Sequence, residues 1–309
     1  MKLIRNRSPL LSQSCGCVVT LGNFDGIHLG HQVLLKKLEA LKASSHLPVV
    51  LITFEPQPKE FFAKRQTVSR LMRFCEKWLA LQAYSIDYVL CLQFNTALAN
   101  LSPEQFVRQI VVGQLNAKIV VVGDDFHFGA KRAGDYEQLK KLGEQYSFQA
   151  IELPTVMLDG ERVSSTRVRQ ALEAGNLDYA QQLLGRPYRL YGKVVHGDRL
   201  GRHLGYPTAN INLHRQLVPL AGIFVIRVYG LGERFYNGVA NLGTRPTVGG
   251  TRILLEVHLF DFNAEIYGRH IEVEFLHKLR DEVRYDAIEE LVNQIRRDVK
   301  NAKGYFESS

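Results

Sequence analysis

The apolar segments of this chain change their rhythm once, near residue 186, and this change restricts the folds that the sequence can adopt. Before it, short runs rich in Val, Ile and Leu alternate with amphipathic stretches. Such runs are typical of strands that are covered on both faces. We predict five of them, at residues 17–21, 49–54, 88–92, 119–122 and 148–153. Strands that alternate with helices predict a doubly wound parallel sheet, which is a Rossmann-like α/β fold.

The spacing of apolar residues indicates that the segments between these strands are helices. Apolar residues recur three and four positions apart at Val33, Leu34, Leu38 and Leu41, and again at Leu71, Phe74, Trp78 and Leu81. The segment Ser102-Pro103-Glu104-Gln105 predicts a helix start, with Ser102 as the N-cap and Gln105 closing a capping box. A further helical run, residues 167–184, ends this half of the chain.

After residue 186 the apolar segments are all strand-like, and Gly or Pro clusters separate them. They lie at residues 190–195, 223–229, 235–242, 253–260 and 271–275. This pattern predicts an antiparallel sheet or small β-barrel. The chain then ends in a predicted helix, capped by Asp286, whose apolar stripe is formed by Ile288, Leu291, Val292, Ile295 and Val299. We therefore predict two domains, residues 1–186 and 187–309.

Composition and the apolar pattern argue against several classes of protein. No apolar run approaches the roughly 18 residues that a membrane-spanning helix needs. The first residues do not resemble a secretory signal, and four cysteines supply neither a disulfide framework nor a paired zinc motif. These features predict a cytoplasmic location. The net charge of +8 is compatible with nucleic-acid binding and equally with small phosphorylated substrates.

A glycine-rich turn with two histidines follows the first predicted buried strand. Its sequence is Gly22-Asn23-Phe24-Asp25-Gly26-Ile27-His28-Leu29-Gly30-His31, and we expect a helix to begin at about Gly30. Gly22 and Gly26 permit a tight turn, and the free amides of a helix start favour anions. His28 and His31 can both reach one side of that helix and donate to phosphate oxygens. The segment predicts a phosphate site; zinc ligation by the two histidines is the alternative, although no third ligand has a recognisable spacing.

Two later segments of the first half carry polar groups near predicted element ends. Asp125, Phe126 and Phe128 follow a strand, where a flat ring could stack on the aromatic side chains, although both phenylalanines would also suit the core. Ser165 and Thr166 lie at a predicted helix start, with Arg169 one turn on. Hydroxyls there can cap the helix or, together with the guanidinium, clamp a triphosphate.

The second half contains a glycine-rich basic segment before its second strand. Glycines 192, 197, 201 and 205 are interleaved with Lys193, His196, Arg199, Arg202 and His203, which suits either a flap over polyphosphate or a plain basic hairpin loop. Thr208 and Asn210 follow Pro207 and lie two apart, so on an extended segment their oxygens face the same way. Such oxygens are hard ligands that suit Mg²⁺.

These segments, in this order, resemble the bacterial bifunctional riboflavin kinase/FMN adenylyltransferases, also called FAD synthetases. The resemblance is carried by the H-x-G-H motif at His28 to His31, by Thr53-Phe54-Glu55-Pro56, by residues 123–129 and 163–169, by Pro207-Thr208-Ala209-Asn210, and by Glu256-Val257-His258-Leu259-Phe260-Asp261-Phe262. One departure is Gln57, which stands where the family commonly has histidine.

The resemblance implies specific roles. It implies ATP binding in the first domain by Gly22, Phe24, Gly26, His28, His31, Ser165, Thr166 and Arg169, and in the second by Gly197, Gly201, Pro207, Thr208 and Asn210. It further implies flavin contacts by Asp125, Phe126 and Phe128, and Mg²⁺ ligation by Thr208 and Asn210. The catalytic residues would be His28 and His31 in one site and Glu256, as the base, in the other.

The implied activity has two steps, which need ATP, Mg²⁺ and the flavin substrates but no nucleic-acid or membrane partner. The barrel would phosphorylate riboflavin to FMN, and the nucleotidyltransferase domain would adenylylate FMN to FAD and release pyrophosphate. The sequence leaves two alternatives open. One is an H-x-G-H enzyme with another acceptor, such as phosphopantetheine or nicotinamide mononucleotide, and the other is a nucleic-acid or regulatory binding protein that uses the positive charge.

Overall fold

The structure is a computed structural model that describes residues 1–5, 15–63, 69–197, 201, 204–215, 217–247 and 250–308; for 244–247 and 250–252 the description covers the backbone. The chain divides into two compact units. One comprises Met1–Val68 and Met72–Ser164, and the other Ser69–Leu71 and Ser165–Ser309. We call them the sheet unit and the barrel unit.

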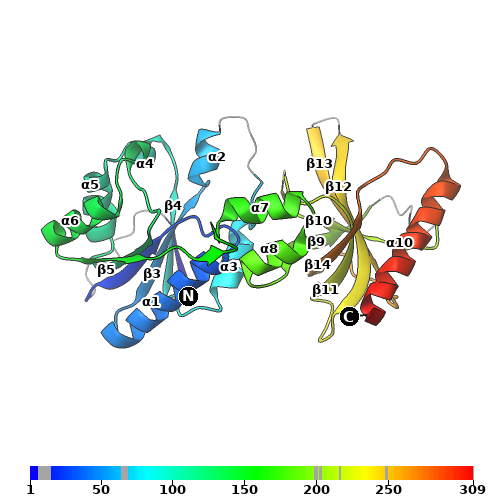
Figure 1. Cartoon of the computed structure of the whole chain (residues 1–309), viewed down its shortest axis with the longest axis horizontal. Helices are drawn as coiled ribbons and strands as arrows, with labels where there is room; N and C mark the ends of the chain where they lie inside the picture. Colours follow the sequence, from blue (N-terminus) through cyan, green and yellow to red (C-terminus); the bar gives the residue numbers. More distant parts are fainter. Residues whose placement is uncertain are drawn as a thin grey trace. The chain divides into compact units, whose positions relative to one another are not determined.

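The sheet unit is built on a six-stranded parallel sheet with the order β1-β4-β3-β2-β5-β6 (Figure 1). Its strands are β1 (Lys2–Arg5), β2 (Cys17–Leu21), β3 (Val49–Glu55), β4 (Tyr88–Gln93), β5 (Ala117–Gly123) and β6 (Gln149–Leu153). The five predicted strands are confirmed. The sequence did not indicate β1, because of its four residues only Ile4 is buried.

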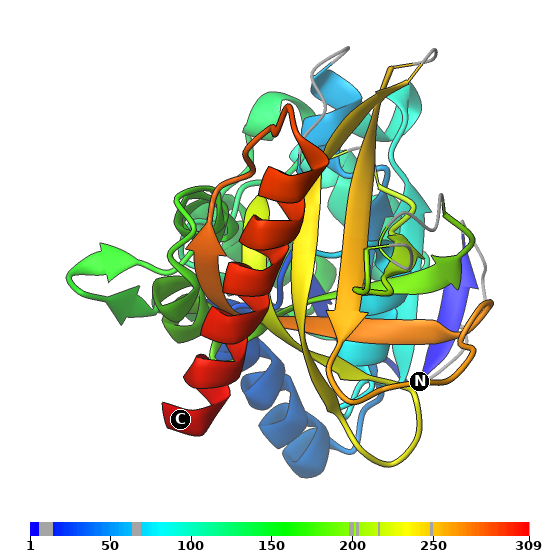
Figure 2. The same cartoon turned by 90° about the vertical axis from the view of Figure 1, so that its right-hand side faces the viewer.

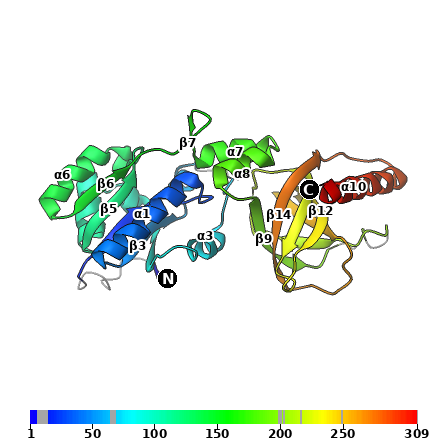
Figure 3. The ribbon, with the colours of Figure 1, turned by 60° about the horizontal axis from the view of Figure 1, so that its bottom comes forward.

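Helices cover both faces of this sheet. On one face lie α1 (Leu29–Ser45) and α3 (Phe74–Leu81); on the other lie α5 (Pro103–Phe106), the π-helical turn η2 (Val107–Val112) and α6 (Tyr136–Tyr146). Figure 3 shows α1 running along the sheet, and α1 contacts β2, β3 and β5. The remaining elements are short: α2 (Pro58–Phe62), α4 (Thr96–Ala99), η3 (Ala130–Arg132), and the hairpin of β7 (Met157–Leu158) and β8 (Glu161–Arg162). The predicted doubly wound fold is confirmed.

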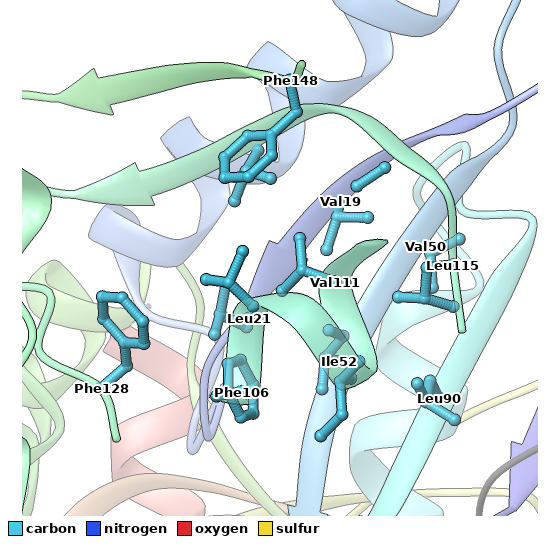
Figure 4. Packing of buried hydrophobic residues seen from close by; sticks show 14 of the residues in the cluster. Val19, Leu21, Val50, Ile52, Leu90, Phe106, Val111, Leu115, Phe128 and Phe148 are labelled. Carbon is cyan, nitrogen blue, oxygen red and sulfur yellow. The ribbon is translucent and has the colours of Figure 1, made fainter. Parts of the chain in front are cut away.

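The central strand β2 shows why its residues form a covered strand. All five of its side chains are buried. Because alternate residues face opposite ways, Val19 and Leu21 pack with Phe106 and its neighbours, whereas Val18 packs in the cluster on the other face. Figure 4 shows the first of these clusters. Full burial of one such aliphatic side chain contributes about 1.5–3 kcal/mol, so the two clusters hold the sheet and its helices together.

Two details of the predicted helices are tested by the structure. The capping box at Ser102 is confirmed: Ser102 Oγ accepts from the Gln105 amide at 3.1 Å, and Gln105 Oε1 accepts from the Ser102 amide at 2.9 Å. The predicted stripe on α1 was wrong at Val33, which is 43% exposed. The buried residues of α1 are Leu34, Leu35 and Leu38, since the true apolar stripe is narrower than the predicted one.

The barrel unit is a closed antiparallel barrel with the order β10-β13-β12-β11-β14-β9. Its strands are β9 (Tyr188–Val195), β10 (Ala209–Asn212), β11 (Gly222–Tyr229), β12 (Tyr236–Thr247), β13 (Gly250–Leu259) and β14 (His270–Arg280). The five predicted strands and the barrel are confirmed. The sequence did not indicate β10 as a strand, because it is short and two of its four residues are asparagine.

The helical run predicted at 167–184 is two helices, α7 (Ser165–Glu173) and α8 (Leu177–Leu184). The run is interrupted because Gly175 adopts a φ of 72° and Asn176 caps α8, accepting from the Tyr179 amide at 3.0 Å. Both helices belong to the barrel unit, and the domain boundary predicted after residue 186 stays a prediction.

The predicted C-terminal helix is confirmed as α10 (Ile288–Ser308), which packs against β11, β12 and β14 (Figure 2). The predicted stripe was wrong at Ile288, which is 63% exposed, and the helix begins two residues after Asp286. The buried residues of α10 include Asp298, whose carboxylate accepts from the Arg280 guanidinium at 2.7 to 3.1 Å. This ion pair fastens α10 to the end of β14.

Candidate active sites

Two loops of the sheet unit leave the sheet at the point where its strand order reverses. From β2 the chain adds β3 and β4 on one side, and then β5 and β6 on the other. In open parallel sheets ligands bind outside the carboxyl ends of the strands at such a switch point. The loop of residues 22–28 follows β2, and the loop of residues 124–129 follows β5. Both predicted segments of the first site therefore lie where the fold favours a ligand.

The loop of residues 22–28 turns sharply before α1. Phe24, Gly26 and Ile27 have φ values of 48°, 87° and 44°, and His28 is the N-cap of α1 with extended backbone. The predicted helix start is correct to within one residue, because α1 begins at Leu29. Its first turn contains no acidic residue. The free amides at such a helix start favour an anionic ligand.

His28 and His31 lie together, as predicted. Their ring centroids are 3.8 Å apart and the planes meet at 26°, while the Phe24 ring lies 5.0 Å from that of His31. Gly30 makes room for this pair, since a Cβ atom there would lie 3.2 Å from the His28 ring. The buried Nδ1 of His31 has no hydrogen-bond partner among the described residues. An imidazole nitrogen without a protein partner is available to a ligand.

The electrostatic environment keeps the His31 imidazole neutral. Burial lowers the pKa of His31 well below its ordinary value, and the positive charges of His28, Lys77 and Arg162 lower it further. A neutral imidazole donates through one nitrogen only. Positive charge at this site therefore has to come from neighbours of His31.

One such neighbour, Lys77, is a residue that the sequence analysis missed. Its side chain is 1% exposed, and its Nζ donates to Thr53 Oγ1 at the end of β3 over 3.3 Å. Buried lysines are rare and need compensation. A signal was present in the sequence: Lys77 lies three residues after Phe74 and four before Leu81, on the apolar stripe of α3.

The loop after β5 separates its three predicted flavin contacts. Asp125 is exposed and forms an ion pair with Arg162 of β8. Phe126 is half-buried and stacks on Phe128, with centroids 5.2 Å apart. Phe128 itself is buried beside Phe106 in the hydrophobic cluster of Figure 4, the core position that its sequence context also allowed. Asp125 and Phe126 are thus more accessible to a ligand than Phe128.

The structure also shows the surroundings of Gly22 and Gln57. Gly22 lies against the Phe24 ring, which a Cβ atom would approach to 3.2 Å. Gln57 is the N-cap of α2 and its side chain is 2% exposed. Its Nε2 is buried without a hydrogen-bond partner among the described residues. Gln57 thus retains an amide donor that no described residue uses.

Ser165, Thr166 and Arg169 lie in the first turns of α7, and hence in the barrel unit. The Arg169 guanidinium donates to the carbonyl oxygen of Ser69 at 2.6 Å and to that of Ser165 at 3.1 Å. The predicted helix start is confirmed. The role of these three residues toward ATP stays a prediction.

The barrel unit contains a cavity of about 210 Å³ outside the barrel wall. One side is polar and includes Thr208, Asn241 and Glu256; the other has apolar residues from β11, β12 and α10 together with the ion pair of Arg280 and Asp298. The apolar side chains on these elements include Ile223, Val239, Leu291 and Ile295. Leu255 and Val257 are buried in the barrel, so the alternation of β13 turns Glu256 outward to this cavity.

Strand register brings the predicted residues Asn210 and Glu256 together. Glu256 of β13 pairs with Asn210 of β10 on one side and with Asn241 of β12 on the other. Residues that pair across antiparallel strands share a face and have Cβ atoms about 4.5–5.5 Å apart. Asn210, Glu256 and Asn241 therefore form one polar row on the outside of the barrel.

Two glycines border this row. A Cβ atom on Gly201 would lie 3.1 Å from Thr208 Oγ1, and one on Gly197 would collide with the Asn210 amide. Among the predicted residues, Gly201, Thr208 and Glu256 line the cavity, whereas Gly197, Pro207 and Asn210 lie beside its lining. The predicted flap residues Arg199, Arg202 and His203 are outside the described residues.

Comparison with known proteins distinguishes between the alternatives. A family model for FAD synthetase matches residues 11–167, and one for riboflavin kinase matches residues 184–306. The bifunctional riboflavin kinase/FMN adenylyltransferase of Haemophilus influenzae is 42% identical over 308 residues, which is all of both chains. That of Escherichia coli K12 is 47% identical over 99% of this chain and 98% of the relative. The chain belongs to the bifunctional riboflavin kinase/FMN adenylyltransferase family.

A solved structure also matches this family member over nearly its whole length. It is a Streptococcus pneumoniae chain described as a macrolide-efflux protein, with a TM-score of 0.82 and 32% identity over 96% of this chain and 97% of that one. The match supports the fold, and the efflux description applies to the Streptococcus protein alone. In the described part of the present chain, no helix is both long and apolar enough to cross a membrane.

Membership of the family assigns the two sites to different segments. The stacked histidines, Lys77 and the loop after β5 lie within the FAD synthetase match. Thr208, Asn210, Asn241 and Glu256 lie within the riboflavin kinase match. Each match thus contains one of the two clusters of polar groups described above.

Proposed function

We propose that FMN is adenylylated at the histidine loop of the sheet unit and that riboflavin is phosphorylated at the cavity of the barrel unit. The overall activity follows from family membership: the protein converts riboflavin to FMN and FMN to FAD, with ATP as co-substrate in both steps. The proposal goes beyond that activity in two respects, the residues that carry each step and a cytoplasmic location, which rests on the cysteine content.

In the first site, the FMN phosphate attacks the α-phosphorus of ATP. A bond forms between that phosphorus and an FMN phosphate oxygen, and the bond to the β-phosphate oxygen breaks, so that pyrophosphate leaves. No covalent enzyme intermediate is needed. His28, His31 and the amides at the start of α1 donate to phosphate oxygens, and Lys77 supplies a buried positive charge.

Other predicted residues bind flavin or phosphate groups. Asp125 and Phe126 of the sheet unit contact the flavin, and Ser165, Thr166 and Arg169 of α7 bind polyphosphate. Gly22, Phe24 and Gly26 shape the loop that approaches the nucleotide. The proposal is supported by the position of this loop at the switch point of the sheet and by the ring nitrogen of His31, which has no hydrogen-bond partner in the described part of the chain.

In the second site, Glu256 accepts the proton of the ribityl 5′-hydroxyl as that oxygen attacks the γ-phosphorus of ATP. The bond between the γ-phosphorus and the β–γ bridging oxygen breaks, and ADP leaves. Thr208 and Asn210 would hold a magnesium ion, since a hydroxyl oxygen and an amide oxygen are hard ligands that suit it. Bound there with ATP, the ion would neutralise charge on the phosphates.

The lining of the cavity suits the flavin substrate of this step. Its apolar side, formed by β11, β12 and α10, can receive the isoalloxazine ring, and its polar side leads to Glu256. The observation that carries the proposal is the polar row of Asn210, Glu256 and Asn241, because it sets a carboxylate between amides at the edge of an apolar cavity.

The experiment is incubation of the full chain with riboflavin, ATP and Mg²⁺, followed by chromatography of the flavins. We expect FMN to appear first and FAD to follow. An incubation with FMN in place of riboflavin tests the first site alone. Riboflavin that is recovered unchanged, or RNA binding that is sensitive to salt without any flavin binding, would contradict the proposal.

A further inference from the structure

Asn241 is a polar residue of the barrel cavity that takes no part in the two steps proposed above. Its neighbours along β12, Ala240 and Leu242, are buried, so the alternation of the strand turns the Asn241 side chain outward. There it lines the cavity. Its Oδ1 is buried and has no hydrogen-bond partner among the described residues. Buried polar atoms are nearly always paired, so an unpaired one that borders a cavity indicates a ligand.

The register places Asn241 at the boundary between the two sides of the cavity. Across one strand pair it faces Glu256, the proposed base, and across the other it faces Ile223, part of the apolar wall. Each cross-strand neighbour is about 4.5–5.5 Å away at Cβ. A substrate that reaches from the apolar wall to Glu256 therefore passes Asn241.

We propose that Asn241 binds the ribityl chain of riboflavin by accepting a hydrogen bond from one of its secondary hydroxyls. This proposal rests on the function proposed for the cavity. The primary hydroxyl lies at Glu256, and a secondary hydroxyl of the same chain reaches the neighbouring strand. The ligand class is a flavin with a polyhydroxylated side chain on N10. The hydrogen bond holds the chain at a second point, so that the primary oxygen stays beside its base.

The matched control for this proposal lies on the same strand. Asn237 is also an asparagine of β12 with a buried Oδ1 that lacks a partner among the described residues. Unlike Asn241, it is not part of the cavity lining. A comparison of substitutions at Asn237 and Asn241 therefore separates the effect of removing an asparagine from β12 from the effect of removing a ligand contact.

The experiment measures binding of two flavins to the full chain by quenching of flavin fluorescence. Riboflavin has the ribityl chain, whereas lumiflavin has the same ring with a methyl group on N10. We expect Asn241→Ala to weaken riboflavin binding about 10- to 100-fold, the range for loss of a buried hydrogen bond, and to leave lumiflavin binding unchanged. Asn237→Ala should change neither affinity.

A folding measurement and a second variant keep the result decisive. A thermal melt of each variant, compared with that of the unmodified protein, reports whether the barrel unit is folded, and Asn241→Val, which suits a strand, replaces Asn241→Ala if that variant is not folded. Equal losses for riboflavin and lumiflavin, or no loss for either, would overturn the role of Asn241. Failure of the unmodified protein to bind riboflavin would instead overturn the function proposed for the cavity, and with it this inference.

Discussion

The two sites of this protein position their polar groups by different means. In the sheet unit, the stacked histidines are positioned by a loop that contains three residues of positive φ, and a buried lysine from a separate helix lowers the pKa of His31. In the barrel unit, Asn210, Glu256 and Asn241 are set by the register of three antiparallel strands. The first arrangement depends on local backbone geometry and packing, whereas the second follows from strand pairing alone. Substitutions should therefore act on the two sites separately.

The largest effect is expected in the barrel site. Glu256→Gln keeps the size of the side chain but removes the proton acceptor, so formation of FMN should fall by about 10²- to 10⁴-fold. Formation of FAD from supplied FMN should stay unchanged. Initial rates measured by flavin chromatography check both. A loss of both activities in a folded variant would show that the sites are not separate.

A somewhat smaller effect is expected from the buried lysine. Lys77→Met keeps the length of the side chain but removes its charge, and FAD formation should fall about 10²-fold, as for loss of one preorganised charged donor. FMN formation from riboflavin should be unaffected. The matched control is Thr53→Val, which removes the hydroxyl that accepts from Lys77 but keeps the charge. Equal rates for Lys77→Met and the unmodified protein would exclude a role for Lys77 in the reaction.

Gly30 offers a test of the loop geometry. Gly30→Ala adds a methyl group 3.2 Å from the His28 ring and should displace it, lowering FAD formation about 10-fold. Gly304 of α10 is the control, because a Cβ atom there meets no atom within 4 Å. Gly304→Ala should leave both activities unchanged. If Gly30→Ala also leaves both activities unchanged, then the stacked histidines do not need this glycine.

The smallest effect is a change of stability with pH. The pKa of His31 is below 6.5 in the folded chain, because of burial and the charges of His28, Lys77 and Arg162. Between that lowered pKa and about 6.5 the unfolded chain binds a proton that the folded chain does not, so stability falls as the pH drops through this window. His31→Gln should therefore lose less Tm than the unmodified protein between about pH 7.5 and about pH 5.5. Thermal melts at both pH values measure this, and equal losses would contradict it.

Most of the fold was predictable because its signals are local. The covered strands of the sheet are continuous apolar runs, and Ser102 and Gln105 formed the predicted capping box. The strands that were missed, β1 and β10, have four residues each and too few apolar side chains to show a period. Ile288 was misplaced for a different reason: a helical stripe indicates which residues are apolar, but not where the surface it packs against ends.

The candidate sites were predictable in their residues but not in their arrangement. His28 and His31 are three apart on one helix start, so their proximity follows from the sequence. The row of Asn210, Glu256 and Asn241 does not, because the register of β10, β12 and β13 is a long-range property. Lys77 shows the limit of helical patterns, since a lysine on an apolar stripe is normally interpreted as an interruption of it.

The separation of the two sites is tested most directly by mixing two variants. If the sites are separate, His28→Ala should still make FMN from riboflavin, and Glu256→Ala should still convert FMN to FAD. Neither variant alone should make FAD from riboflavin, whereas an equimolar mixture with ATP and Mg²⁺ should make it. A mixture of two folded variants that produces no FAD would contradict the account.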